Sequence, residues 1–230
     1  MIGVNLVWIV FLIAFVGVFV ALGVLSILRM KSVDEENRSF MRLFPCELIK
    51  DSIPGANVYR TLLYVFSGLC FAPVFVVLPL IDEFGGLGAL AMIVSFLYGI
   101  EGIVMVSIFL FNIRYTNTHT KLSTGFMAGS FLINGLTTLY AVLTFTTWNK
   151  YDMGSAVALV MAILGSLLTI GTLVITLNPK LKNWAQLVKI EDGEVAAYKR
   201  PKIFPLAFSE WLIILINFIG EVVFLISLIR

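Results

Sequence analysis

Charged residues are scarce in this sequence. Only 13% of its 230 residues are Asp, Glu, Lys or Arg, about half the share found in a soluble domain. Hydrophobic residues make up 60%, and the mean hydropathy is +1.00. So few polar side chains cannot cover a water-facing globule of this size, which excludes a soluble fold and indicates a lipid-facing surface. The net charge of +2 gives no reason to expect a nucleic-acid partner.

Histidine and cysteine are scarce as well. His119 is the only histidine, and the two cysteines are Cys46 and Cys70. A bis-histidine haem, a zinc protease site or an iron–sulfur cluster needs more ligands of these types. Catalytic motifs such as HExxH and GxSxG do not occur in the sequence. We therefore expect no metal and no cofactor, two free thiols, and a solvated His119 in a loop.

Long apolar stretches are what the sequence has in abundance. Each is long enough to cross a bilayer as a helix, which takes about 20 residues, and none alternates as the strands of a barrel do. The six stretches cover about 3–28, 61–81, 86–113, 123–147, 155–177 and 206–229. The sequence therefore predicts an all-α, polytopic integral membrane protein, with a single transmembrane helical domain over residues 1–230.

The basic residues predict the orientation of these helices. Fourteen of the sixteen Lys and Arg residues fall in three alternate connections, 29–60, 114–122 and 178–205. The positive-inside rule assigns these connections to the cytoplasm. Both termini are then expected outside, and a plasma or inner membrane is the expected location.

The connection over residues 178–205 has a helical pattern of its own. Asn178 and Pro179 are typical of a helix cap and first turn, and apolar residues then recur on one face. Lysines beside that face would meet lipid headgroups, as in a helix lying on the membrane surface. The residues expected on the membrane-facing side of this interfacial helix are Leu181, Trp184 and Val188.

Acidic residues within the apolar stretches are the main functional signal. Glu101 lies near the middle of the third predicted helix, and insertion scales assign an acidic residue there a cost of about 2.5 to 3.5 kcal/mol. Glu210, Asn217 and Glu221 are spaced by seven and four residues, so they share one face of the sixth helix. Glu210 is expected to be an ordinary charge at the cytoplasmic boundary. Glu101 and Glu221 should face the bundle interior, a partner or a water pocket.

Small and weakly polar residues occupy the fourth and fifth predicted helices. Asn134 is a candidate hydrogen-bond partner for Glu101, and Glu101, Asn134, Asn217 and Glu221 form the predicted polar core. Gly125 and Gly129 form a GxxxG pair, and Gly165 belongs to a stripe of threonines. Such residues favour close helix contact over substrate binding.

Three functions remain open at this stage. A small ion- or proton-linked transporter or channel is the leading hypothesis, because carboxylates in a medium of low dielectric bind cations and protons. The alternative is a non-catalytic subunit or accessory protein of a larger membrane complex, whose partners besides the lipid bilayer are other subunits or a second copy. A lipid-modifying enzyme comes third, since no catalytic motif supports it. The most useful observation is whether Glu101 and Glu221 face one cavity.

Overall fold

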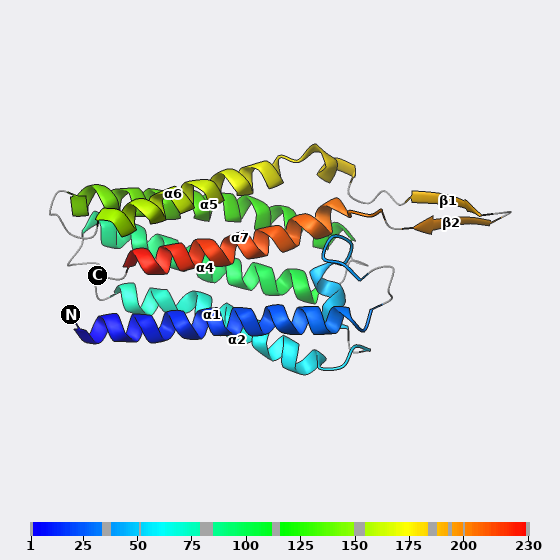
Figure 1. Cartoon of the computed structure of the whole chain (residues 1–230), viewed down its shortest axis with the longest axis horizontal. Helices are drawn as coiled ribbons and strands as arrows, with labels where there is room; N and C mark the ends of the chain where they lie inside the picture. Colours follow the sequence, from blue (N-terminus) through cyan, green and yellow to red (C-terminus); the bar gives the residue numbers. More distant parts are fainter. Residues whose placement is uncertain are drawn as a thin grey trace.

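Six long α-helices form the body of the protein. The computed structural model describes residues 2–33, 38–50, 52–78, 85–111, 116–149, 155–183, 188–192, 195–199 and 201–228. The helices are α1 (Ile2–Met30), α2 (Ala56–Val77), α4 (Gly86–Leu110), α5 (Thr116–Asn149), α6 (Ser155–Thr176) and α7 (Pro205–Leu228), arranged as one bundle (Figure 1). All six are long and apolar enough to span a membrane, so the six-helix prediction is confirmed.

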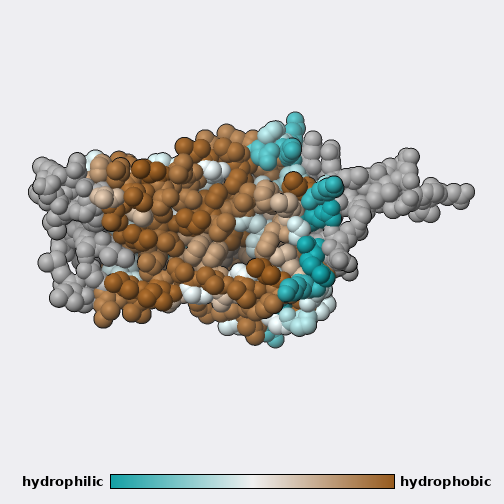
Figure 2. Space-filling view, in the orientation of Figure 1, coloured by the Kyte–Doolittle hydropathy of each residue, from teal (hydrophilic) through white to brown (hydrophobic). Residues whose placement is uncertain are grey.

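The two ends of the bundle differ in character. α1 begins and α7 ends at one end, and the opposite end carries the short 3-10 helices η2 (Pro45–Ile49) and η4 (Pro179–Asn183) (Figure 1). Figure 2 shows a broad apolar band across the visible face of the bundle and hydrophilic residues at this second end. We call it the basic end, after the exposed residues Lys31, Lys50, Lys121, Lys182 and Lys202.

A two-stranded antiparallel hairpin extends from the basic end (Figure 1). Strand β1 (Val188–Asp192) pairs with β2 (Val195–Lys199), with Val188 opposite Lys199 and Asp192 opposite Val195. This pairing corrects the predicted interfacial helix at Val188.

The predicted interfacial helix is confirmed only at its cap and first turn, where η4 covers Pro179–Asn183 and Asn178 Oδ1 accepts a hydrogen bond from the Lys180 N–H group, and it was wrong at Val188. Leu181 lies in η4, Val188 begins β1, and Trp184 lies outside the described residues. Only two residues, Gly193 and Glu194, separate the strands in the sequence, and a two-residue connection that begins with glycine favours a tight hairpin. Local strand pairing across it outweighs a helical periodicity of only a few residues.

Two helices lie at the centre of the bundle. In the most apolar stretch of each helix, 56% of the residues of α4 and 50% of those of α7 are buried, against 17% of those of α1. These are the helices that carry the acidic residues, so their carboxyl groups are enclosed by protein. The outer helix α1 packs on this centre through the buried Phe15, which stacks on Phe66 of α2 and Phe218 of α7 with ring centroids 5.1 and 5.5 Å apart.

Arg29 fastens the η2 segment to the bundle. It is only 3% exposed although it lies in the last turn of an apolar helix. Its guanidinium donates hydrogen bonds to the carbonyl oxygens of Leu48 (2.6 Å), Pro54 (2.5 Å) and Lys50 (3.2 Å). A planar group with several donors suits three fixed acceptors, so this arginine holds the connection between α1 and α2 in place.

Candidate functional site

Hydrogen bonds join three of the predicted polar-core residues. Glu101 of α4 is 6% exposed, and its Oε1 atom accepts hydrogen bonds from Ser130 Oγ of α5 (2.7 Å) and Asn217 Nδ2 of α7 (3.3 Å). Asn217 Oδ1 in turn accepts a hydrogen bond from Asn134 Nδ2 of α5 at 3.1 Å. We call Glu101, Ser130, Asn134 and Asn217 the central network; it links α4, α5 and α7.

Threonines extend these contacts to α6. Asn134 Nδ2 lies 3.5 Å from Thr172 Oγ1, and the hydroxyl groups of Thr138 and Thr169 are 3.0 Å apart. A Cβ atom at Gly165 would lie 2.9 Å from Thr138 Oγ1, so the glycine allows α5 and α6 to approach closely. The close helix contact predicted at Gly165 is confirmed.

The fourth predicted polar-core residue, Glu221, lies one helical turn from the central network. It is 2% exposed and hydrogen-bonds the thiol of Cys70. Its Oε1 atom has no hydrogen-bond partner among the described residues. Glu101, Asn217 and Glu221 line one cavity of about 20 Å³. A water molecule needs about 10 to 15 Å³ of this kind of space, so the cavity has room for one water or one small cation.

A second hollow reaches Glu101 from the opposite side. It is a groove of about 460 Å³ between α4 and α5, with Lys121 at its basic end and Gly125 and Gly129 on its wall. A Cβ atom at Gly129 would lie 2.7 Å from Glu101 Oε2, so only glycine leaves the carboxyl group its present position. A Cβ atom at Gly125 would meet nothing within 4 Å. The GxxxG pair therefore lines an open groove, and the close contact predicted for it was wrong at Gly125.

A separate polar cluster lies nearer the basic end. His119, Ser123 and Glu210 are all 0% exposed. Glu210 Oε1 lies 3.0 Å from His119 Nε2 and accepts a 2.5 Å hydrogen bond from Ser123 Oγ, while His119 Nδ1 donates to the carbonyl oxygen of Phe111 at 2.9 Å. Because that carbonyl can only accept, the proton between Nε2 and Oε1 belongs to either His119 or Glu210.

Two predictions are corrected by this cluster. His119 was expected in a solvated loop, but α5 begins at Thr116, before the predicted position 123, and places His119 on its buried face. Glu210 was expected to be an interface charge, but it lies on the second turn of α7 and is enclosed by α5. His119 was assigned to a loop because the predicted helix began only at position 123, and Glu210 was assigned to the interface because it lies near the cytoplasmic end of its helix.

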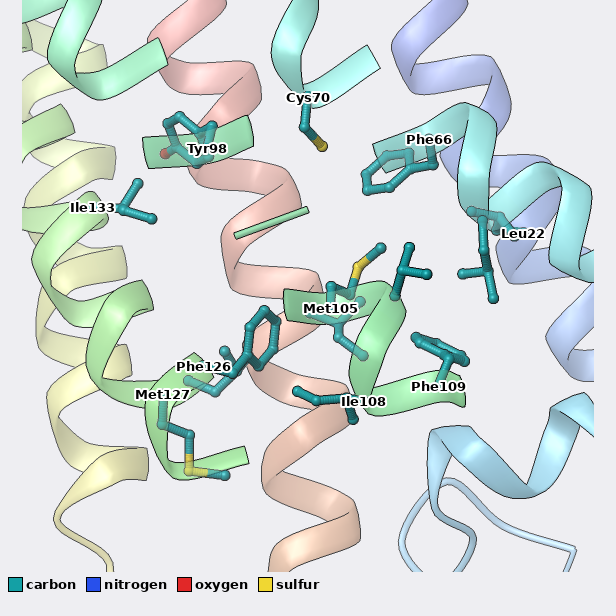
Figure 3. Close-up of a cluster of buried hydrophobic side chains, with 14 of the residues drawn as sticks. Leu22, Phe66, Cys70, Tyr98, Met105, Ile108, Phe109, Phe126, Met127 and Ile133 are labelled. Atoms are coloured by element: carbon teal, nitrogen blue, oxygen red, sulfur yellow. The ribbon is translucent and has the colours of Figure 1, made fainter. Parts of the chain in front are cut away.

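An apolar layer separates this cluster from the central network. Glu210 and Asn217 are seven residues apart on α7, or about 10.5 Å along the helix axis. The space between is filled by buried side chains: Met105, Ile108, Phe126, Met127 and Ile213. Figure 3 shows Phe126, Met127 and Ile108 at one level of the bundle and Cys70 and Tyr98 at another. The predicted polar stripe along α7 is therefore interrupted, and the groove extends from the basic end to Glu101 on another side of the bundle.

Aromatic side chains cover the cavity on the side away from the basic end. Phe224 is 0% exposed and packs against Tyr98 and Tyr140, with ring centroids 5.9 and 5.4 Å apart. The Tyr98 hydroxyl is paired with Thr137 Oγ1 at 3.0 Å. Glu101 thus lines both the groove between α4 and α5 and the small cavity that it shares with Glu221.

No family model matches this chain, and no curated protein and no solved structure is significantly similar to it. The function therefore has to be inferred from the geometry. Among the described residues, no group of three or more His, Cys, Asp or Glu side chains could hold a metal ion. The carboxyl groups of Glu101 and Glu221, which line one small cavity, can bind a proton or a cation.

Sequence reasoning missed several residues of the site, although a signal for them was present. His119, Ser123, Phe126 and Ser130 are spaced by four, three and four residues, and all four are buried. This spacing is typical of the inward face of a helix. Treating the polar residues His119 and Ser123 as part of this inward-facing pattern would have extended the predicted helix and placed both residues in the bundle. Cys70 carried no comparable signal, because its role depends on how α2 packs against α7.

Proposed function

We propose that the protein is a small proton-linked transporter in which Glu101 is the group that takes up and releases the proton. One observation carries the proposal: Glu101 lies between a groove of about 460 Å³ and a cavity of about 20 Å³ that it shares with Glu221. Acidic residues inside membrane spans are costly and mark proton relays and substrate pathways. The basic end faces the cytoplasm by the positive-inside rule, both termini are outside, and the protein resides in a plasma or inner membrane.

The way Glu101 is held suits proton exchange. Ser130 and Asn217 both donate to Oε1, and Oε2 receives no hydrogen bond from any described residue. Oε2 lies beside Gly129, on the wall of the groove. A proton can therefore arrive at Oε2 while both existing hydrogen bonds stay in place. One water in the cavity would connect Glu101 with Glu221 and its unpartnered Oε1 atom.

The asymmetry of the site favours a transporter over a channel. A channel needs a continuous path, whereas alternating access opens a central site to one side at a time. Here the groove extends to the basic end at Lys121, and Phe224 packs over the other side of the cavity. We assign this arrangement to the state open toward the cytoplasm.

Proton flux into liposomes tests the proposal. We expect the reconstituted wild type to move protons down an imposed gradient, read by a pH-sensitive dye. Glu101→Gln keeps the shape of the side chain but cannot exchange a proton, so flux should fall at least tenfold. Glu191→Gln, in strand β1 of the hairpin, is the control and should leave flux unchanged. Absence of wild-type flux, or equal flux in Glu101→Gln, would contradict the proposal.

A non-catalytic subunit of a larger membrane complex is the second candidate. The observation in its favour is the central network itself, because hydrogen bonds that join several helices stabilise a bundle without any transport. It predicts that another membrane protein, or a second copy, co-purifies in mild detergent and that wild-type liposomes show no flux. A single monodisperse chain that conducts protons would exclude it.

A further inference from the structure

The groove between α4 and α5 has the character of a site for an organic ligand. Its volume of about 460 Å³ falls within the range of small-molecule sites, about 300 to 1,000 Å³. Such sites are mostly apolar, with few polar groups that fix the ligand. The walls here are provided by leucine, isoleucine and valine side chains such as Leu97, Ile100 and Val104, and Glu101 lines the groove together with them.

Glu101 presents an unpartnered acceptor to this groove. The side chain is 6% exposed, and both of its hydrogen bonds end on Oε1. Oε2 lies beside Gly129, which lines the groove, and receives no hydrogen bond from a described residue. An acceptor in apolar surroundings attracts a cation strongly, because water screens it little.

The charge of Lys121 opposes a cation bound at Glu101 less than the carboxylate attracts it. Lys121 is exposed at the basic end of the groove, and Gly129 lies eight residues further along α5, or about 12 Å along the helix. At that distance Lys121 acts on the cation several times more weakly than a carboxylate in contact with it at about 3 to 4 Å, because Coulomb energy falls with distance. The inner end of the groove is therefore acidic although its mouth is basic.

We propose that this groove binds an organic monocation with an apolar body, whose charged group lies against Glu101 Oε2. The inference deepens the proposed function and rests on it for the coupling: Oε2 accepts either a proton or the cation, so the two exchange. The other titratable groups around Glu101 are Glu221 of α7, Cys70 of α2 and Tyr98 of α4, and Lys121 of α5 lies at the mouth. Of these, only Glu101 and Lys121 line the groove.

Binding of two organic cations, compared with that of an anion of the same shape as one of them, tests the proposal. Purified full-length protein in neutral detergent is titrated with tetraphenylphosphonium, with the smaller benzyltrimethylammonium, and with tetraphenylborate as the anion. We expect at least one of the two cations to bind saturably and at least ten times more tightly to the wild type than to Glu101→Gln. Tetraphenylborate should not compete with the cations for the groove. Equal cation binding in Glu101→Gln, or no binding of either cation, would overturn the proposal. Stronger binding of tetraphenylborate would overturn it as well, in favour of an apolar groove filled by lipid chains.

A matched pair of glycine variants checks the location independently of Glu101. Gly125 lines the groove and Gly135, on the same helix, does not; a Cβ atom at either would meet nothing within 4 Å. We expect Gly125→Leu to weaken cation binding at least tenfold and Gly135→Leu to leave it unchanged. Similar affinities in the two variants would place the cation elsewhere.

The pH dependence separates this inference from the proposed function. If protons and the cation exchange at Glu101, lowering the pH weakens cation binding up to tenfold per pH unit. Cation binding that depends on Glu101 but not on pH would retain the site and refute proton coupling. Glu101-dependent proton flux without cation binding would refute the site and retain the proposed function.

Discussion

Removing His119 tests the buried cluster at the basic end, where structure and sequence disagree most. His119 and Glu210 are both 0% exposed and 3.0 Å apart, so His119→Ala leaves the Glu210 carboxyl group with Ser123 as its donor. Breaking a buried pair by removing one partner costs about 3 to 5 kcal/mol. A solvated loop histidine would cost no more than about 0.5 kcal/mol. Because Ser123 remains, we expect a loss near the lower value, about 3 kcal/mol, in the free energy of unfolding.

A double-mutant cycle isolates the pair from other effects of the substitution. We expect His119→Leu and Glu210→Leu each to destabilise strongly, and the double variant to lose less than the sum by about 1 to 3 kcal/mol. Equilibrium unfolding in mixed micelles, followed by circular dichroism, gives the four free energies. Thr124→Ala, an exposed change on the same helix, should stay within about 0.5 kcal/mol of wild type. Single losses below about 0.5 kcal/mol, or additive ones, would refute the buried pair.

Two further substitutions test other contacts. Gly129→Ala brings a Cβ atom within 2.7 Å of Glu101 Oε2, so we expect proton flux in liposomes to fall at least tenfold. Gly135→Ala, on the same helix but outside the groove, is the control and should leave flux unchanged. Arg29→Lys keeps the charge but cannot donate hydrogen bonds to the carbonyl oxygens of Leu48, Lys50 and Pro54 together. We therefore expect the free energy of unfolding, measured by thermal unfolding, to fall by about 1 to 3 kcal/mol. Wild-type stability in this variant would show that the three hydrogen bonds contribute nothing.

The membrane helices were predictable because lipid imposes a simple rule. A spanning segment must be apolar and long enough to cross the bilayer, so apolar length alone located all six helices to within a few residues except at the start of α5 and both ends of α2. The first turns of α5 contain Thr116, Asn117, Thr118 and His119, which carry no apolar signal. Because the predicted helix lacked these first turns, His119 was assigned to a solvated loop and was not recognised as the partner of Glu210.

The polar core was predictable in its members but not in its geometry. Spacing along α7 shows that Asn217 and Glu221 share a face, but the approach of Ser130 to Glu101 depends on how α5 is rotated against α4. Side-chain packing across the bundle decides that rotation, and no local pattern reports it. The groove and the cavity are likewise products of packing, so Gly125 and Gly129 were assigned to a helix contact.

The two carboxyl groups are held differently, and the difference assigns them different roles. Glu101 has two donors on Oε1 and reaches the groove with Oε2, whereas Glu221 has the Cys70 thiol beside it and does not line the groove. Glu101 is thus placed to meet both a ligand and a proton, and Glu221 only a proton that arrives through the cavity. Glu221→Gln should therefore reduce proton flux and leave tetraphenylphosphonium binding unchanged, whereas Glu101→Gln should abolish both. If Glu221→Gln weakens binding of the cation as strongly as Glu101→Gln does, the two carboxylates form one site and this division of roles is wrong.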